Sequence, residues 1–221
     1  MAIECIIFDF DGVVADSETS ANAVLAAYAT ELGLPLTTGD SLAIFGGRRA
    51  ADTAAELERR LGRAVPGFPA ELERRTLAAF ADGLREVDGV SGFLARTRGL
   101  ARCIASSSSH ARLRFCLRRL GLEDELGGIV INGDDVARGK PAPDIFLRAL
   151  ERTATAADRA IVIEDSPGGV RAAVAAGIRV IGLLAAGHLG PDHGDRLRDA
   201  GATFLARDYD AVRALIEGPI P

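Results

Sequence analysis

Acidic side chains follow two short apolar runs of this 221-residue chain, at the points where the runs end. Asp9 and Asp11 come directly after the first run, and Glu164 and Asp165 come directly after the fourth. Carboxylates that are brought together repel one another, and a divalent cation removes the repulsion. Oxygen ligands without His or Cys suit Mg²⁺ better than Zn²⁺. The pattern therefore indicates a magnesium site, provided that the two runs end side by side.

A hydroxyl group and an amine occupy similar positions. Ser106 and Ser107 come where the second apolar run ends, and Lys140 lies in the loop after the third. A Mg²⁺ ion with few protein ligands keeps positions open for a phosphate oxygen. Lys140 and the backbone N–H groups after Ser106 can hold the other phosphate oxygens. The set suits phosphoryl transfer, in which positioning and charge neutralisation do most of the work.

Each of these motifs also has a simpler explanation. Asp9–Gly12 contains the residues of a turn. Glu164–Pro167 is typical of a helix N-cap with proline at the first helical position. Ser106–Ser109 is typical of a loop or a cap. Their joint placement at the ends of three apolar runs favours the catalytic interpretation.

The apolar runs themselves predict a parallel sheet. They are too short for buried helices and do not alternate with polar residues, which is typical of strands covered on both faces. The runs are 5–8, 103–105, 129–131, 161–163 and 180–184. Helical patterns at 111–120, 144–151 and 169–176 separate the later runs, and another at 196–200 follows the last. This alternation predicts an α/β fold with a doubly wound sheet, whose ligands bind beyond the carboxyl ends of the strands.

The interval from Asp16 to about Val87 contains no convincing strand. It has helical spacing at 21–32, 49–61 and 70–81, with Asp16 or Ser17 as the first N-cap. We therefore expect residues 1–15 and 88–221 to form an α/β core, and residues 16–87 to form an inserted all-helical cap. The hinges would lie at 13–16 and 86–90.

Composition limits the class of protein. The 26 basic and 31 acidic residues give a net charge of −5, which argues against a nucleic-acid partner. No apolar run approaches the ~20 residues that cross a bilayer, and the first residues carry no basic flank. We expect a cytoplasmic protein, a monomer or weak dimer, that acts on a small-molecule phosphoester. The three cysteines are expected to be buried as small apolar side chains.

Four motifs make the chain resemble the haloacid dehalogenase superfamily. In chain order they are Asp9–Ser17, Ile104–Ser107, Gly139–Asp144 and Ile163–Ser166 followed by Gly168–Gly169. The resemblance is to the subgroup that contains phosphoglycolate phosphatases, sugar phosphatases and β-phosphoglucomutases. It spans nearly the whole chain and is much more specific for the superfamily than for a substrate. Asp11 favours phosphoryl chemistry, because dehalogenases of the superfamily typically lack an Asp at this place.

The resemblance implies a role for each motif residue. Asp9 would be the nucleophile that forms an aspartyl-phosphate, and Asp11 would protonate the leaving group and then activate water. Ser106 and Lys140 would bind the transferring phosphoryl group. The ligands implied for Mg²⁺ are Asp9, the carbonyl of Asp11, and Asp165. Glu164 would either bind the ion directly or hold one of its ligands in place. The activity implied is a Mg²⁺-dependent phosphatase for a sugar or sugar-acid phosphate.

Substrate choice is expected in the cap, at Phe45–Arg49. Gly47, Arg48 and Arg49 are candidate substrate-binding residues, because Arg pairs with carboxylates and phosphates. The alternative is that both arginines are solvated residues at a helix start in a chain whose 26 basic residues include one lysine, Lys140. Ser107 completes the candidate binding residues.

Two other activities remain open. A β-phosphoglucomutase-like mutase is the first, but residues 17–88 contain no His and no Lys, the cap residue types that such mutases use. A phospho-accepting receiver module is the second, but receivers are shorter and lack a helical cap. His110 is interpreted as a surface residue at a helix start, and His188 and His193 receive no role.

Overall fold

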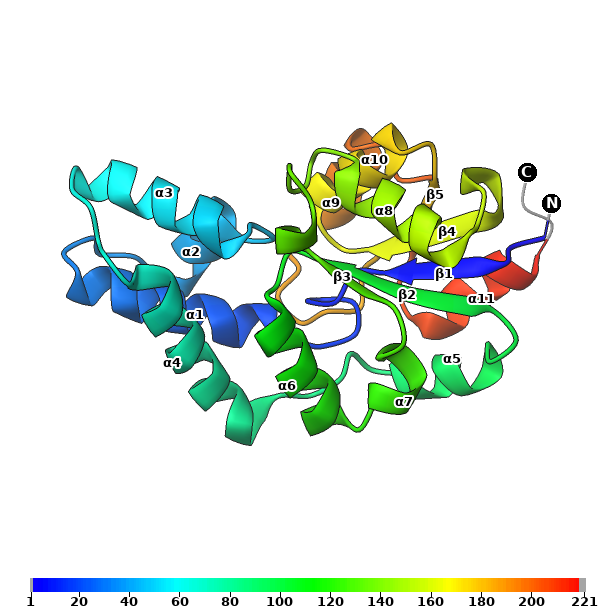
Figure 1. Ribbon diagram of the computed structural model, residues 1–221, viewed down its shortest axis with the longest axis horizontal. Coiled ribbons are helices and arrows are strands. Elements are labelled where there is room, and N and C mark those ends of the chain that lie inside the picture. Colours follow the sequence, from blue (N-terminus) through cyan, green and yellow to red (C-terminus); the bar gives the residue numbers. More distant parts are fainter. Residues whose placement is uncertain (1, 219–221) are drawn as a thin grey trace.

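A parallel sheet and a group of helices form the two lobes of the molecule (Figure 1). The structure, a computed structural model, describes residues 2–218. The strands are β1 (Cys5–Phe8), β2 (Ala101–Ser106), β3 (Val130–Asn132), β4 (Ala160–Glu164), β5 (Arg179–Leu183) and β6 (Phe204–Ala206). All pairs are parallel, in the order β3-β2-β1-β4-β5-β6. The predicted doubly wound α/β fold is confirmed, and β1 lies at its centre, between β2 and β4.

The sequence predicted five of these six strands. The missing one, β6, is a three-residue edge strand whose first two residues are only half-buried. Such a short run gives no periodic signal, and it joins the sheet only because it pairs with β5. The five predicted runs agree with the observed strands to within one or two residues at each end.

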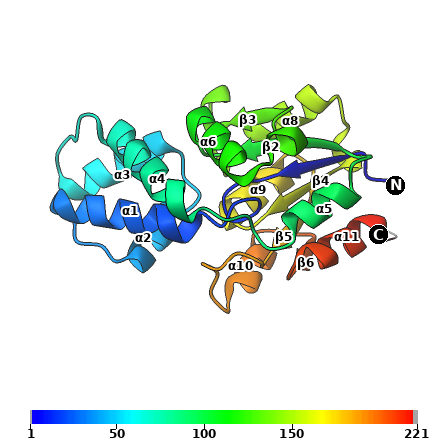
Figure 2. The same ribbon diagram turned by 90° about the horizontal axis from the view of Figure 1, so that it is seen from below.

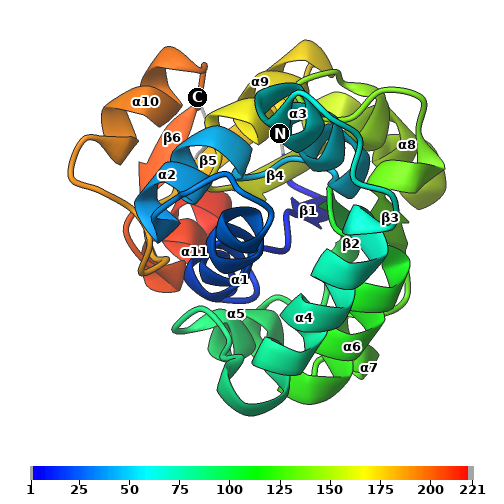
Figure 3. The ribbon, with the colours of Figure 1, turned by 90° about the vertical axis from the view of Figure 1, so that its left-hand side faces the viewer.

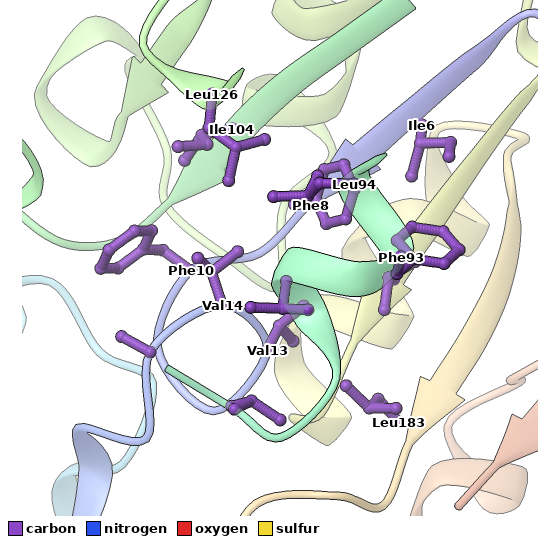
Figure 4. Packing of buried hydrophobic residues seen from close by; sticks show 14 of the residues in the cluster. Ile6, Phe8, Phe10, Val13, Val14, Phe93, Leu94, Ile104, Leu126 and Leu183 are labelled. Atoms are coloured by element: carbon purple, nitrogen blue, oxygen red, sulfur yellow. The ribbon is translucent and has the colours of Figure 1, made fainter. Parts of the chain in front are cut away.

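Helices cover both faces of the sheet (Figures 1 and 2). One face packs against α5 (Val90–Arg96), α6 (His110–Leu120), α7 (Glu123–Leu126) and α11 (Tyr209–Glu217), and the other against α8 (Asp144–Thr153), α9 (Pro167–Ala175) and α10 (His193–Asp199). Two 3₁₀ turns, η1 (Gly133–Asp135) and η2 (Ala157–Arg159), follow β3 and precede β4. In β1, Ile6 and Phe8 enter the first layer (Figure 4), whereas Cys5 and Ile7 enter the second. Burial on both faces fixes the register of β1, and therefore the position of the residue that follows it.

The inserted lobe consists of α1 (Glu18–Glu31), α2 (Thr38–Phe45), α3 (Ala50–Leu61) and α4 (Phe68–Gly83). It has an apolar cluster of its own, which includes Leu25, Phe45, Leu57 and Phe68. The prediction of helices at α1, α3 and α4 is confirmed. Helix α2 was missed, although a capping box between Thr37 and Asp40 marks its start. Figure 3 shows this lobe in front of the carboxyl ends of the strands.

Two chain segments connect the lobes, and they lie side by side. Ala15 and Glu86 form an antiparallel bridge. The Asp16 amide donates to the Arg85 carbonyl at 3.0 Å, and the Val87 amide donates to the Val14 carbonyl at 2.9 Å. The paired residues fall in the predicted hinge segments 13–16 and 86–90, except Arg85, which lies one residue before the second segment. Paired backbone at this point ties the inserted lobe directly to the loop that carries Asp9 and Asp11.

Two smaller predictions concern membranes and cysteines. Among residues 2–218, no helix has the length and apolar character needed to cross a bilayer. Cys5, Cys103 and Cys116 are buried free thiols, as predicted. Burial raises the pKa of all three thiols, which keeps them in the neutral, unreactive form.

Candidate active site

Lys140 joins two carboxylates at the carboxyl ends of the central strands. Its Nζ atom lies 2.8 Å from Asp9 Oδ1, beyond β1, and 2.7 Å from Glu164 Oε1, at the end of β4. The lysine side chain is 4 % exposed, and Glu164 is fully buried. Burial alone would lower the pKa of Lys140, but the charges of Asp9 and Glu164 outweigh it and raise the pKa. The only lysine of the chain is therefore a permanent cation between two acidic motifs.

The acidic residues exceed the single positive charge beside them. Oxygen atoms of Asp9, Glu164 and Asp165 all lie within 4.8 Å of one another. Burial first, and the neighbouring Glu164 charge as well, raise the pKa of Asp9 to about 7 and that of Asp165 well above its ordinary range. Three carboxylates against one ammonium leave an unbalanced negative charge that a divalent cation would neutralise. The donor set consists of oxygen atoms alone and fits Mg²⁺.

Two glycines allow the backbone to approach these carboxylates closely. A Cβ atom on Gly12 would lie 1.8 Å from Asp165 Oδ2, and one on Gly169 would lie 1.5 Å from Glu164 Oε1. Gly12 also has a φ of +79°, which favours glycine. These glycines of the first and fourth motifs are therefore required by the site geometry.

Asp11 lies at the same edge, but its carboxylate is held by a different set of groups. Oδ1 accepts from Ser17 Oγ at 2.5 Å and from Arg112 at 2.6 Å, while Oδ2 accepts from Ser108 Oγ at 2.6 Å. Burial would raise the pKa of Asp11, but the Arg112 charge and the two hydroxyl groups outweigh it and lower the pKa. The structure therefore separates the two aspartates of the first motif into different environments.

The serine residues of the second motif lie where the sequence placed them. Ser106 ends β2, is 1 % exposed, and its Oγ accepts from the Ser108 amide at 3.1 Å. Ser107 lines the same cavity. Ser109 caps α6 and its hydroxyl donates to Glu73 of α4 at 2.6 Å. The serine run thus contacts Asp11 on one side and the inserted lobe on the other.

The candidate substrate-binding residues of the insert do not all face the cavity. Gly47 and Arg48 line it. Arg49 instead pairs with Asp52 at 2.9 Å and contacts the Gly133 carbonyl at 3.4 Å. In this arrangement Arg49 bridges the insert and the core, and its role in substrate binding stays a prediction.

Four residues near the site were not recognised from the sequence. Arg112 of α6 and Glu18 of α1 flank Asp11 and line the cavity. In a chain so rich in arginine, the residue type gave no signal for Arg112. His188 and His193 both reach Asp165: His188 Nε2 lies 3.4 Å from Oδ2, and His193 Nε2 lies 2.5 Å from the carbonyl oxygen.

The environment of His188 keeps its ring neutral. The ring is 12 % exposed, and burial first, then the nearby His193, lower its pKa to about 4. A neutral imidazole donates one hydrogen bond without adding charge to the acidic cluster. His110, by contrast, is exposed at the start of α6, as predicted from the sequence. Its ring contacts Asp135.

A cavity of about 1020 Å³ separates the acidic edge of the core from the insert. Its lining combines Asp9, Asp11, Ser106, Lys140 and Asp165 from the core with side chains of α1, α3 and α4. The space is large enough for a small phosphorylated metabolite.

Comparisons with known proteins agree with this geometry. The sequence model of the family described as haloacid dehalogenase-like hydrolase matches residues 6–183. The chain is 30 % identical to a phosphorylated carbohydrates phosphatase of Thermotoga maritima, over 97 % of this chain and 99 % of the relative. A haloacid dehalogenase-like protein of unknown function from Agrobacterium tumefaciens has the same fold, with a TM-score of 0.82, 33 % identity, and coverage of 97 % of this chain and 98 % of that one. A putative β-phosphoglucomutase from Thermotoga maritima matches with a TM-score of 0.73, 29 % identity, and coverage of 97 % and 99 %.

Proposed function

The chain belongs to the haloacid dehalogenase-like hydrolase family and is a phosphoric monoester hydrolase, and we propose that it dephosphorylates a small sugar or sugar-acid phosphate through Asp9. The observation that carries this proposal is the contact of Lys140 with Asp9 beside an acidic cluster at the centre of the sheet. Lys140 holds one Asp9 oxygen at 2.8 Å and leaves the other to act on the substrate. Phosphorylated carbohydrates are the substrates that the Thermotoga maritima relative is named for.

The proposed reaction has two displacements at phosphorus. An Asp9 oxygen attacks the phosphorus atom, the bond to the leaving oxygen breaks, and Asp11 delivers a proton to that oxygen. Asp11 must first take up this proton, because its contacts with Arg112, Ser17 and Ser108 favour the ionised form. Asp11 then removes a proton from water, which attacks the aspartyl-phosphate and releases inorganic phosphate and free Asp9. Lys140 and Ser106 bind the phosphoryl oxygens during both steps.

Mg²⁺ is the proposed cofactor. Asp9, the carbonyl of Asp11 and Asp165 would hold it. Both Glu164 oxygens already have partners: Oε1 accepts from Lys140, and Oε2 accepts from the Ser166 amide at 2.6 Å. Glu164 is therefore proposed to hold Lys140 in place rather than to bind the ion directly. When bound, the cation neutralises the charge of the nucleophile and of the phosphoryl group.

We propose that residues 16–87 act as a mobile cap over the site. Helix α4 contacts the core through Glu73 and Ser109, and through the Ala81 carbonyl, which accepts from Arg119 at 2.8 Å. Few polar contacts and a two-stranded connection suit a lobe that opens and closes. Closure would exclude water while Asp9 attacks, and opening would admit the water that completes the reaction.

The test is phosphate release from a panel of sugar phosphates, polyol phosphates, phosphogluconate and phosphoglycolate, with Mg²⁺ and with a chelator. We expect Mg²⁺-dependent release, and its loss in Asp9→Asn with little change in stability. Asp124→Asn, at an exposed carboxylate of α7, is the matched control. Robust turnover by purified Asp9→Asn would overturn the covalent role of Asp9.

The mutase is the second candidate, and the similarity to a putative β-phosphoglucomutase keeps it open. The absence of His and Lys from residues 17–88 favours the phosphatase. Given β-glucose 1-phosphate and a bisphosphate primer, we expect free phosphate or no reaction. Accumulation of glucose 6-phosphate would replace the phosphatase proposal with the mutase. The cytoplasmic location and the monomeric or weakly dimeric state stay predictions.

A further inference from the structure

Glu18, Asn22 and Arg112 form a polar wall of the cavity near Asp11. Glu18 begins α1, and Asn22 follows one helical turn later on the same side. Arg112 reaches the same place from α6 in the core. All three line the cavity, and none belongs to the motifs that carry the proposed phosphoryl chemistry. Because Asp11 is the proposed proton donor to the leaving group, this wall is where the leaving group would lie.

Glu18 is a carboxylate whose partners are neutral. Its Oε2 accepts from Asn22 Nδ2 at 2.6 Å, and the nearby backbone of Gly47 also favours the ionised form, which lowers its pKa. Within residues 2–218, no Lys, Arg or His nitrogen lies within 4.0 Å of it. Burial first, and then the Asp11 charge, raise the pKa of Glu18 to about 7. Glu18 therefore has spare acceptor capacity that faces the cavity.

Arg112 carries a positive charge near Glu18, but its guanidinium is already paired with Asp11. Its guanidinium donates to Asp11 at 2.6 Å and lies 5.0 Å from the centre of the Phe80 ring. Its Nε atom is buried and has no partner. A carboxylate entering this wall would meet Glu18 and compete with Asp11 for Arg112. A hydroxyl group would donate to Glu18 and accept from Arg112, and so would match both.

We propose that Glu18 and Arg112 form the subsite for the leaving group, and that this subsite selects an uncharged, hydroxylated alcohol over one whose carboxylate is bonded directly to the phosphoester carbon. The selection comes as much from repulsion between Glu18 and a substrate carboxylate as from hydrogen bonds between a substrate hydroxyl group and the subsite. This inference rests on the proposed function and narrows its substrate class. A carboxylate farther along the leaving group, outside this wall, is not excluded by the same contacts.

Two esters that differ at one carbon test the subsite: 2-hydroxyethyl phosphate and 2-phosphoglycolate, assayed with Mg²⁺ at pH 8, where Glu18 is ionised. We expect kcat/KM to favour the hydroxyl compound by about tenfold or more, the scale of one uncompensated charge contact in a partly buried site. In Glu18→Gln the ratio should fall to about threefold or less, because kcat/KM for 2-phosphoglycolate rises. Glu31→Gln, at an exposed carboxylate paired with Arg75 at the other end of α1, should keep the parent ratio.

A binding measurement separates this inference from the proposed function. Dissociation constants of both esters are measured by phosphorus NMR titration with Asp9→Asn and with Asp9→Asn combined with Glu18→Gln. If the parent releases no phosphate from any ester, the proposed function fails, and the two binding ratios still decide the subsite. The same preference with and without the Glu18 carboxylate, or a parent that prefers 2-phosphoglycolate, would overturn the inference.

Discussion

On the sheet side of the cavity, two carboxylates share one ammonium group, whereas on the side of the insert the Glu18 carboxylate is hydrogen-bonded to a neutral amide. Asp9 and Glu164 share Lys140, at 2.8 and 2.7 Å. Glu18 instead accepts from the amide side chain of Asn22, and Arg48 is exposed. The first arrangement suits a step that is the same for every phosphoester, because the phosphoryl group never changes. The second suits a part of the substrate that differs between enzymes.

The two regions also differ in what holds them in place. The sheet residues follow strands that are buried on both faces, so their positions are fixed by the main core. The insert has a smaller apolar cluster and is connected to the core by two paired segments. We expect the lobe with the larger apolar core to be the more stable one, so the proposed chemistry would lie on the more stable lobe and the proposed selectivity on the less stable one.

The largest expected effect concerns this difference in stability. Phe68 is fully buried in the cluster of the insert and stacks on Tyr28, with ring centres 5.2 Å apart. Phe68→Ala should cost about 3–5 kcal/mol of local stability. Hydrogen exchange should then show α1–α4 losing protection while β1 and β4 keep it. Phe146→Ala, a fully buried position in the core, should lower protection in both lobes. Equal loss in β1 after Phe68→Ala would show that the lobes unfold as one unit.

The next effect tests the geometry of the ion pairs on the sheet side. Lys140→Arg keeps the charge but replaces a compact ammonium with a broad, planar guanidinium in a space that is 4 % exposed. We expect kcat to fall by at least ~10²-fold, the scale on which the loss of a preorganised donor is felt. Steady-state phosphate release measures the change. Near-normal kcat would mean that charge alone suffices at this position.

A smaller effect is expected at the edge of the acidic cluster. His188 contacts Asp165, and its neutral ring can orient that carboxylate for a cation. His188→Asn should weaken Mg²⁺ binding by about tenfold, at the lower end of what is lost with such supporting contacts. Isothermal titration with Mg²⁺ measures this directly. His110→Asn, at an exposed histidine, should bind as the parent does, and equal affinity in all three proteins would remove His188 from the site.

The last expected effect is a change of stability with pH. Burial raises the pKa of Glu18 from 4.5 to about 7, so the folded state binds this proton more tightly than the unfolded chain does. The folded state therefore loses stability as pH rises between these values. Glu18→Gln lacks this loss, and its stability relative to the parent should grow by about 2–3 kcal/mol from pH 5 to pH 8. Urea unfolding at both pH values measures the change, and a flat difference would show that Glu18 is not destabilised by burial.

The sequence by itself determined the fold class and the chemistry. Short apolar runs gave five of the six strands, and the residues just after them gave Asp9, Ser106 and Asp165. These residues could be predicted because the carboxyl ends of parallel strands lie at one edge of the sheet. Residues that directly follow neighbouring strands are therefore close together in space. Lys140 could be recognised for the same reason, and because it is the only lysine in the chain.

Only the tertiary structure decided which side chains surround Asp11 and Asp165 and where Arg49 points. Arg112 contacts Asp11 across 101 positions of sequence, and that contact depends on how α6 packs beneath the insert. Arg49 faces Asp52 and the core rather than the cavity, which no local pattern could indicate. His188, in the loop after β5, contacts Asp165, which follows β4. Contacts between long side chains on different elements depend on how those elements pack against one another. The periodicity of the sequence carries no information on the distance between two such elements.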